Sequence, residues 1–550
     1  MRQFAIASLV VIACSPNERP ADPPWDFTPN IVWIVAEDLS PVIPAFGDST
    51  ITTPNLSRLA AEGVRYGNVF SPSGVCAPSR AAVATGMYPT AIGAMHMRTG
   101  PWWGSEASPA ALERHREWFI PYEAVPPAHV RMHSELLRRG GYYTTNRAKH
   151  DYQFRAPVTA WDETSPRAHW RDRRAGQPFF SIFNLGVTHE SQIWARASDS
   201  LLVGDDLAVP VPPYLPTTDV ALRDVRRMYS NIIIMDRQVG ELLDELEAAR
   251  LLDSTIVFWF GDHGGPLPRQ KRLMYDSGLR VPLIIRFPNG WRAGSTDDRL
   301  ISFVDFLPTL VSLAGLPQPD GLAGRPFEGR DRSLEDRRYI HAAVDRLDAQ
   351  PNGVRAVRDQ RYKYLRHLNP DLAYYTRVAY REQMPIMQEL LRLREAGELT
   401  EPQAQWFRPR RPAEELFDTA VDPHELNNLA GDPEFADKLR ELRLEADRWM
   451  RETNDLGMMP EPEFLESIWP NGIQAVTAAP DAEWSDRTVT LSSATAGASI
   501  GYQLISSADT LIDRWAVYVR PVTVPAGMTL RAVAHRIGYL PSDTITARPQ

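Results

Sequence analysis

The sequence contains only two cysteines, Cys14 and Cys76, in 550 residues. In an exported protein of this size, so few cysteines exclude a fold held together by disulfide bonds. The sequence also lacks basic runs, and its net charge is −9, which argues against a nucleic-acid-binding protein. This charge does not exclude an anionic substrate, because a local basic pocket can coexist with an acidic surface.

Long hydrophobic runs are scarce as well. The apolar stretch at residues 4–13 is too short to span a bilayer and, following Arg2, is typical of the core of a signal peptide. It ends in Val11-Ile12-Ala13-Cys14, which resembles the cleavage box of bacterial lipoproteins. We therefore expect a lipoprotein-type signal peptide at residues 1–14, a lipid anchor on Cys14 as the chain's only contact with a membrane, and a proline-rich tether at residues 15–29. A plain secretory signal is the alternative. Either predicts export, to the periplasm or the outer membrane of a bacterium.

The distribution of apolar residues predicts an α/β fold. Residues 30–36, 178–185 and 255–260 are continuous apolar runs, typical of strands buried on both faces of a parallel sheet. Residues 219–250 have the periodicity of an amphipathic helix. We predict a large, mostly parallel sheet flanked by helices at residues 30–345, a smaller C-terminal α+β subdomain at 346–460, and an appended β-sandwich at 475–550.

Acidic residues directly follow two of the predicted strands. Glu37 and Asp38 follow the first, and Asp262 and His263 follow the third. Ligands of open α/β sheets bind beyond the carboxyl ends of the strands, and neighbouring carboxylates are costly there unless a cation neutralises them. A solvated loop would explain one such pair, but the four residues together predict a divalent-metal cluster. The predominance of oxygen ligands favours Ca²⁺, or Mg²⁺, over zinc.

Residues 71–85 predict a turn followed by a close-packed helix. Gly74 suits the turn, and Pro78 suits the first turn of the helix. Cys76 then lies at the helix N-terminus, where free amides favour an anionic ligand, and Arg80 points back to the same place one turn later. The alternative is an ordinary buried cysteine.

Cys76-Ala77-Pro78-Ser79-Arg80, followed by Thr85-Gly86, resembles the sulfatase signature C-x-P-S-R…T-G. The resemblance extends along most of residues 30–460, and residues 414–429 look closest to N-sulphoglucosamine sulphohydrolase and related glycan sulfatases. In this family a separate formylglycine-generating or sulfatase-maturing enzyme oxidises the cysteine to formylglycine. One oxygen of the formylglycine hydrate attacks sulfur, and the other later expels sulfate.

The resemblance also implies roles for individual residues. Arg80 would hold the nucleophile, Lys149 and Lys271 would neutralise the sulfate, and His189 would be the general acid. The implied metal ligands are Glu37, Asp38, Asp262, His263 and the residue at position 76. Glu37 departs from the family, which normally has aspartate there.

A second departure follows Lys149. Sulfatases usually carry G-K-x-H in this region, and Lys149 matches the lysine. Asp151 occupies the spacing of the histidine, whereas His150 comes one residue early. Either residue could take the role of the family's histidine.

The resemblance implies a hydrolase of sulfuric esters or sulfamates on sulfated carbohydrates such as glycosaminoglycans, or on aryl sulfates. The nearest alternative keeps the fold but hydrolyses phosphonate monoesters or phosphodiesters. An alternative of another class is a non-catalytic, glycan-binding lipoprotein in which Cys76 remains unmodified.

Overall fold

The computed structural model describes residues 23–97, 122–347, 350–506 and 514–549. The predicted signal peptide, Cys14 and the first part of the predicted tether lie outside the described residues. Within the described ranges, every helix is too short or too polar to span a bilayer.

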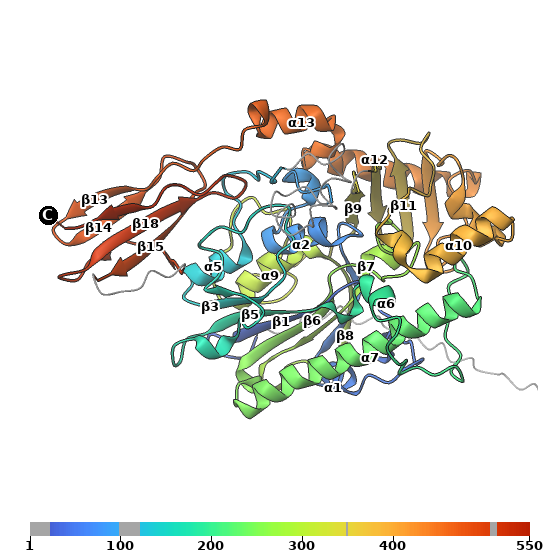
Figure 1. Cartoon of the computed structure of the whole chain (residues 1–550), viewed down its shortest axis with the longest axis horizontal. Coiled ribbons are helices and arrows are strands. Elements are labelled where there is room, and N and C mark those ends of the chain that lie inside the picture. Colours follow the sequence, from blue (N-terminus) through green and yellow to red (C-terminus); the bar gives the residue numbers. More distant parts are fainter. Residues whose placement is uncertain (1–22, 98–121, 348–349, 507–513, 550) are drawn as a thin grey trace, which may run out of the picture.

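The centre of the molecule is an eight-stranded sheet with the strand order β4-β3-β5-β1-β6-β7-β2-β8 (Figure 1). Only β7 is antiparallel to its neighbours, so the predicted mostly parallel sheet is confirmed. The strands are β1 (Asn30–Ala36), β2 (Val64–Phe70), β3 (Tyr143–Arg147), β4 (Glu163–Thr164), β5 (Phe179–Leu185), β6 (Thr255–Gly261), β7 (Arg280–Arg286) and β8 (Ser295–Ser302).

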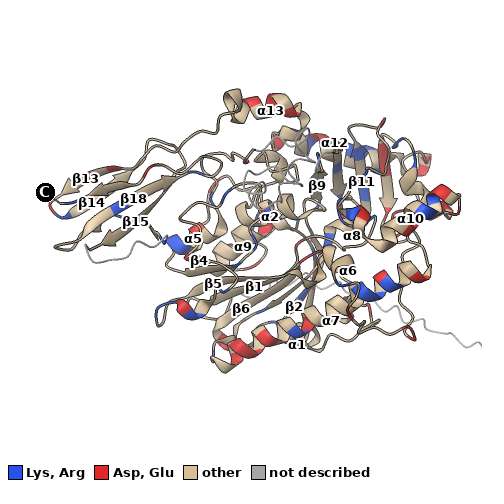
Figure 2. Ribbon diagram, viewed as in Figure 1, with Lys and Arg blue, Asp and Glu red and all other residues tan. Residues whose placement is uncertain are grey.

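Helices cover both faces of this sheet, which explains the continuous apolar runs. On β1, Ile31 and Trp33 belong to the core under α2, α5 and α9, whereas Val32 and Ile34 belong to the core under α1 and α7. Figure 2 shows charged residues along α1 and α7, whereas the central strands have few of them. The helices of this part are α1 (Pro54–Glu62), α2 (Cys76–Thr85), α5 (His133–Arg139), α6 (Ser191–Ala195), α7 (Asp219–Ala248), α8 (Asp276–Leu279) and α9 (Phe306–Leu313).

The register of the sheet brings three strand ends together. Ala36, at the end of β1, is paired with Leu185 of β5 and with Gly261 of β6. The residues that follow these strands therefore emerge side by side at one edge of the sheet. This edge faces the N-terminus of α2.

Two smaller units complete the chain. The first has a four-stranded antiparallel sheet with the order β12-β11-β10-β9; its elements are β9 (Ile340–Val344), β10 (Val354–Arg358), β11 (Tyr362–His367), β12 (Glu414–Asp418), α10 (Pro385–Ala396), α11 (Glu401–Ala404), α12 (Ala436–Glu452) and α13 (Glu461–Ile468). The second has two sheets, β13-β14-β17 and β16-β15-β18-β19, around one apolar core. Its strands are β13 (Asp481–Ser485), β14 (Thr488–Ser492), β15 (Ser499–Ile505), β16 (Ala516–Val517), β17 (Val522–Thr523), β18 (Thr529–His535) and β19 (Ile545–Ala547). The predicted architecture is confirmed, and the domain boundaries stay predictions.

One buried carboxylate makes the stability of this fold depend on pH. Asp224 of α7 is 5% exposed and accepts a hydrogen bond of 2.7 Å from the backbone N–H of Ile386 in α10. Burial raises the pKa of Asp224 to about 7. Because the folded chain holds this proton more tightly than the unfolded chain, the stabilisation is complete below about pH 4 and is lost as the pH rises towards 7.

Asp224→Asn should therefore raise the thermal midpoint at pH 8, where the wild type contains a buried charge. At about pH 4.5, close to the pKa of an aspartate in the unfolded chain, the two proteins should unfold at similar temperatures. Thermal unfolding of both proteins at the two pH values measures the difference. Equal midpoints at pH 8 would contradict the assignment.

Candidate active site

Cys76 is the first residue of α2 and lies beneath the edge where β1, β5 and β6 end. Its side chain is buried, with only 2% of the residue exposed. The preceding turn packs closely against the loop after β6, since a Cβ added to Gly74 would lie 2.6 Å from the carbonyl oxygen of Leu273. The predicted position of Cys76 at a helix N-terminus is confirmed.

Asp38, Asp262 and His263 surround the thiol. The Sγ of Cys76 lies 3.3 Å from Nε2 of His263 and 4.0 Å from Oδ1 of Asp38. One potential ligand atom from each of these four residues lies within 4.8 Å of all the others, and all four residues are buried. Four of the five predicted ligands, all except Glu37, therefore lie together in the structure.

Glu37 does not point into this cluster. Its Oε2 accepts a hydrogen bond of 2.7 Å from Nζ of Lys149. Asp38 follows it in the left-handed region, with φ of 51°, so the chain turns and the two adjacent carboxylates diverge. The geometry favours a charge-pairing role for Glu37, and direct metal ligation by Glu37 stays a prediction.

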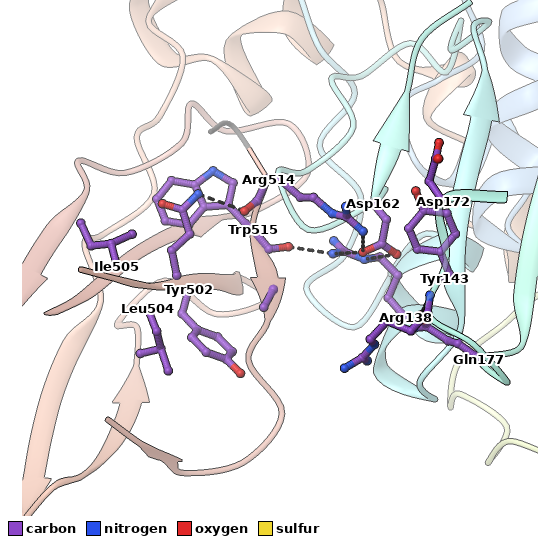
Figure 3. Close-up of a pocket in the computed structure, with 13 residues that line it drawn as sticks. Arg138, Tyr143, Asp162, Asp172, Gln177, Tyr502, Leu504, Ile505, Arg514 and Trp515 are labelled. Atoms are coloured by element: carbon purple, nitrogen blue, oxygen red, sulfur yellow. Dashed lines mark hydrogen bonds and ion pairs between the residues drawn. The ribbon is translucent and has the colours of Figure 1, made fainter. Parts of the chain in front are cut away.

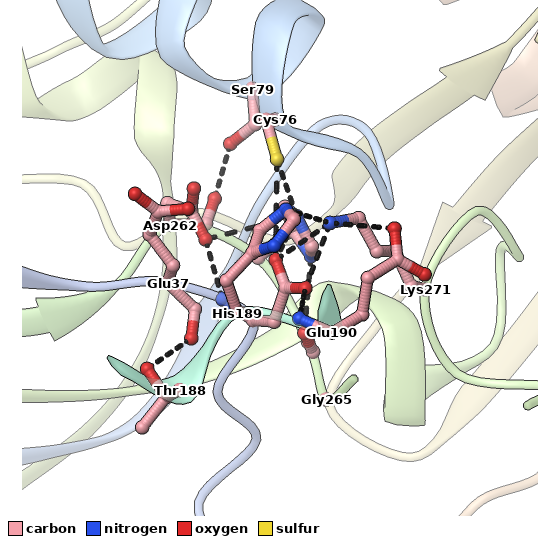
Figure 4. A network of polar contacts seen from close by, with 12 residues as sticks. Glu37, Cys76, Ser79, Thr188, His189, Glu190, Asp262, Gly265 and Lys271 are labelled. Carbon is pink, nitrogen blue, oxygen red and sulfur yellow. Dashed lines mark hydrogen bonds and ion pairs between the residues drawn. The ribbon is translucent and has the colours of Figure 1, made fainter. Parts of the chain in front are cut away.

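Three predicted cations border the cluster, and Figure 4 shows one of them, Lys271, together with Cys76 and Asp262. Arg80 lies along Asp262, with its Nε 3.1 Å from Oδ2, and also donates to Oδ1 of Asn184 at 2.7 Å. Lys271 reaches both carboxylate oxygens of Asp38, at 2.8 and 2.9 Å. Together with Lys149 they place three positive charges around one buried thiol.

His189 faces Lys271 across the site. Its Nε2 is 3.2 Å from Nζ of Lys271, and its Nδ1 accepts a hydrogen bond of 3.2 Å from the backbone N–H of Ser191. The Nε2 edge of the ring therefore faces the site. The position after β5 that the sequence predicted for His189 is confirmed.

Sequence reasoning missed a buried ion pair behind Lys271. Both terminal nitrogens of the Arg272 guanidinium contact the Glu190 carboxylate, at 2.6 and 2.8 Å, and Lys271 lies 3.2 Å from the same carboxylate. The backbone N–H of Glu190 also donates to Asp38, at 2.7 Å. The adjacency of Glu190 to His189, and of Arg272 to Lys271, was the available signal.

The charges around Cys76 shift several ionisation equilibria. Burial by itself would raise the pKa of the Cys76 thiol, but the nearby Lys149 and Lys271 outweigh it and lower this pKa to about 6. Burial would lower the pKa of His263, whereas Asp262, the Cys76 sulfur and Asp38 raise it to about 10. Despite burial, His263 and Arg80 hold the pKa of Asp262 at about 2. The site therefore stabilises an anion at position 76.

The two candidates for the family's missing histidine are differently placed. Nε2 of His150 lies 2.7 Å from Oγ1 of Thr164, and its ring stacks on Tyr152. Oδ2 of Asp151 lies 4.0 Å from Nζ of Lys149. Of the two, Asp151 contacts a residue of the site.

The C-terminal subdomain supports the loop that carries Lys271. Arg269 donates to the backbone carbonyls of His424 and Glu425, at 2.9 and 2.8 Å. The ammonium of Lys363 on β11, which is fully buried, lies 2.5 Å from Asp276 and 3.0 Å from Glu425. The segment at 422–429, singled out in the sequence, therefore positions an active-site loop from another part of the chain.

Lys363→Met should strongly destabilise the fold, because it leaves two buried carboxylates without their shared cation. Breaking a buried ion pair in this way costs on the order of 3–5 kcal/mol. Urea unfolding of the variant measures the loss, and Arg392→Ala, which removes an exposed arginine on α10, is the control. The account fails if both variants unfold at the same urea concentration.

The chain was compared with known proteins. A family model described as sulfatase matches residues 29–316, and a model of the N-sulphoglucosamine sulphohydrolase C-terminal region matches residues 264–376. An ulvan-active sulfatase of Formosa agariphila is 49% identical over 553 residues, covering 94% of this chain and 91% of the relative. Human N-sulphoglucosamine sulphohydrolase is 26% identical and covers 78% of this chain and 90% of its own length.

Solved structures share the fold. A protein in complex with its substrate D-glucosamine-2-N,6-O-disulfate matches with a TM-score of 0.54 and 18% identity, over 78% of this chain and 99% of that one. A phosphonate monoester hydrolase of Agrobacterium radiobacter matches with a TM-score of 0.51 and 17% identity, over 77% of this chain and 96% of its own. At such identities the likeness concerns the fold alone.

Proposed function

The chain belongs to the sulfatase family, and on this basis we propose that it hydrolyses sulfate esters of a carbohydrate polymer such as ulvan. The observation that carries the proposal is the convergence of Arg80, Lys149 and Lys271 on the buried residue 76. Three cations around one nucleophilic position suit a sulfate group, whose charge must be neutralised before an anionic nucleophile can approach. The 49% identity with an ulvan-active sulfatase supports the choice of polymer.

The proposed nucleophile is a formylglycine hydrate made from Cys76 by a maturing enzyme. Its two geminal oxygens would supply both the attack on sulfur and the later release of sulfate. The surroundings of Cys76 suit this group. Nε2 of His263 lies 3.3 Å from the Cys76 sulfur, within reach of an oxygen at this position, and Arg80 and Lys149 provide charge for an anion. The ammonium of Lys271 lies near the same carboxylate, Asp38, that approaches the sulfur.

The donor set also fits a divalent cation. Two buried carboxylates, Asp38 and Asp262, and the imidazole of His263 place potential ligand atoms within 4.8 Å of one another and of residue 76. Oxygen-rich donor sets favour Ca²⁺ or Mg²⁺. When bound, such an ion would lower the pKa of the hydrate and polarise the sulfate. The proposed ligands are Asp38, Asp262 and His263. Direct ligation by Glu37 is less well supported, because its carboxylate pairs with Lys149.

In this proposal, Lys149 and Lys271 bind the sulfate group of the substrate. Both ammonium groups are already held by carboxylates, Lys149 by Glu37 and Lys271 by Asp38 and Glu190. These partners keep the lysines charged and fix their direction. The buried Glu190–Arg272 pair fixes Glu190 in turn.

His189 is the proposed general acid, which donates a proton to the leaving oxygen. Its Nε2 edge faces the site and lies 3.2 Å from Nζ of Lys271. A proton at this atom would neutralise the alkoxide of the sugar as the bond to sulfur breaks. The neutral imidazole can then accept the proton of the second geminal hydroxyl, as that oxygen forms the aldehyde and sulfate leaves.

Sulfate release from ulvan tests the proposal. The full chain, produced in a host that contains a maturing enzyme, should release sulfate from ulvan, and a phosphonate monoester and an N-sulfated glucosamine serve as competing substrates. A chelator should abolish the activity and lower the thermal midpoint, and Ca²⁺ or Mg²⁺ should restore both. Faster hydrolysis of the phosphonate than of any sulfate would overturn the proposed substrate class.

We also propose that the protein is exported and anchored through Cys14. The support is the apolar run at residues 4–13 and the lipoprotein-like box that ends at Cys14. Incorporation of labelled fatty acid into the wild type, and its loss in Cys14→Ala, would test the anchor.

A further inference from the structure

A second cavity lies between the catalytic part and the β-sandwich (Figure 3). Its volume is about 750 Å³, which is within the range of small-ligand sites. One wall comes from α5, the start of β3 and the segment at 172–177, and the other from β15 and β16. Sites at the junction of two units are common among ligand-binding proteins.

A buried ion pair on the catalytic wall also contacts the opposite wall. Arg138 of α5 contacts both oxygens of Asp162, at 2.8 and 3.1 Å, and donates to the backbone carbonyl of Trp515 at 2.7 Å. The Arg138 side chain is only 4% exposed. Arg138 and Asp162 therefore neutralise each other, and the hydrogen bond from Arg138 to Trp515 links this wall to the opposite one.

The other two arginines of the lining are more exposed to solvent than Arg138. Arg174 is exposed and makes no ion pair with any residue in the described ranges. The side chain of Arg514 is 46% exposed, lies over the ring of Tyr143 at 5.2 Å, and is 3.6 Å from Asp162. Asp172 is the other acidic residue in the lining.

The balance of charge favours an anionic ligand. The lining contains three arginines and two aspartates, in a chain whose net charge is −9. Because Arg138 and Asp162 pair with each other, the other charged groups of the lining are two guanidinium groups, of Arg174 and Arg514, and one carboxylate, of Asp172. Guanidinium groups bind oxyanions such as sulfate through paired N–H donors. A local excess of positive charge attracts such anions to an otherwise acidic protein.

The opposite wall is less polar. Tyr502, Leu504 and Ile505 of β15 are half-buried, and they line the cavity together with the buried Trp515. A ligand that fits both walls has one apolar side and several anionic groups. A sulfated sugar chain has both properties, because its rings carry C–H faces and its edges carry sulfates.

The cavity is far from Cys76. Tyr143 is the first residue of β3 and Gln177 precedes β5, so both lie at the amino ends of their strands, whereas the catalytic cluster lies at the carboxyl ends. The seven residues of β5 separate the two ends by about 20 Å at ~3.3 Å per residue. A single sugar cannot occupy both places.

We propose that this cavity is a non-catalytic binding site for a sulfated segment of the polymer on which the enzyme acts. The class of ligand rests on the proposed function, while the site itself rests on the lining residues. Arg174 and Arg514 bind the sulfates, and Tyr502 contacts a sugar ring. The site retains the polymer while other segments of it reach Cys76.

Binding is tested in the full chain with Cys76→Ala as a background that cannot attack the sulfate. Affinity electrophoresis in gels that contain ulvan, or chemically desulfated ulvan, measures the dissociation constant. Arg174→Ala/Arg514→Ala should weaken binding to ulvan roughly tenfold, the loss expected for two exposed charge-assisted contacts. Arg139→Ala/Arg520→Ala is the matched control, since it removes two exposed arginines, one from each unit, that are outside the cavity lining.

Kinetics with the matured enzyme provides a second readout. The cavity variant should raise KM for the polymer severalfold and leave hydrolysis of a small aryl sulfate unchanged, because the aryl sulfate needs only the catalytic cluster. The control variant should leave both unchanged. A Tyr502→Ala variant should reproduce the rise in KM without a change of charge.

The outcomes separate the two proposals. If the enzyme hydrolyses ulvan but the cavity variant binds and turns over the polymer like the control, the cavity site is refuted and the proposed function stands. Equal binding of desulfated ulvan would also refute it. If the wild type neither binds nor hydrolyses any sulfated polysaccharide, the proposed function fails first and the ligand class of the cavity fails with it.

Discussion

Cys76→Ser should abolish turnover and trap a sulfated enzyme. The introduced hydroxyl occupies the same buried position at the start of α2, surrounded by Lys149 and Lys271, so it can still attack sulfur. It has no second oxygen to expel sulfate, and the resulting ester is a dead end. Steady-state activity should fall by at least about a thousandfold, as for the loss of other covalent nucleophiles.

Mass spectrometry after incubation with substrate distinguishes this outcome from simple misfolding. The variant should gain one sulfate on the peptide that contains position 76, whereas Cys76→Ala, which has no hydroxyl, should gain none. Repeated turnover by the Cys76→Ser variant would contradict the formylglycine mechanism.

Lys271→Met should lower kcat/KM by about a hundredfold to a thousandfold, the range observed when a preorganised charge is removed from a transition state. Its ammonium is 3% exposed and contacts Asp38 and Glu190, so water cannot replace it. Methionine keeps most of the side-chain volume, which limits the effect to the loss of charge. Assays with an aryl sulfate measure the loss.

Lys438→Met is the control for this variant. Lys438 pairs with Asp359 and Glu441 near the surface of α12, outside the site. The control should keep wild-type kinetics. Because Lys271 also neutralises two buried carboxylates, thermal unfolding of both variants should accompany the assays. Wild-type kcat/KM in a folded Lys271→Met protein would remove this lysine from the mechanism.

The central sheet was predictable because its strands are buried on both faces and therefore appear as continuous apolar runs. The cluster at its edge followed from the same pattern, since Asp38 and Asp262 come just after strands whose carboxyl ends meet. The position of Cys76 followed from Gly74 and Pro78, which determine where α2 begins. Its chemistry came from the resemblance of residues 76–86 to the sulfatase signature.

The direction of individual side chains was not predictable. Glu37 and Asp38 are adjacent, but the left-handed backbone of Asp38 sends one carboxylate to Lys149 and the other to Lys271. Local sequence cannot determine such a turn, because the contacts that hold it come from distant segments.

Long-range partners were equally hidden. Lys363, Asp276 and Glu425 meet only when the C-terminal subdomain packs against the loop after β6. The cavity at Arg174 and Arg514 exists only because the β-sandwich packs against α5. Neither arrangement has a spacing signal, since the residues that form it are far apart in the chain.

Mass spectrometry of the tryptic peptide Tyr66–Arg80 tests the central proposal most directly. Cleavage after Arg65 and after Arg80 releases a peptide with position 76 as its only cysteine. In active protein from the native host, or from a host with a maturing enzyme, the account predicts the mass of an aldehyde in place of the thiol. An intact thiol throughout a fully active preparation would contradict the formylglycine mechanism.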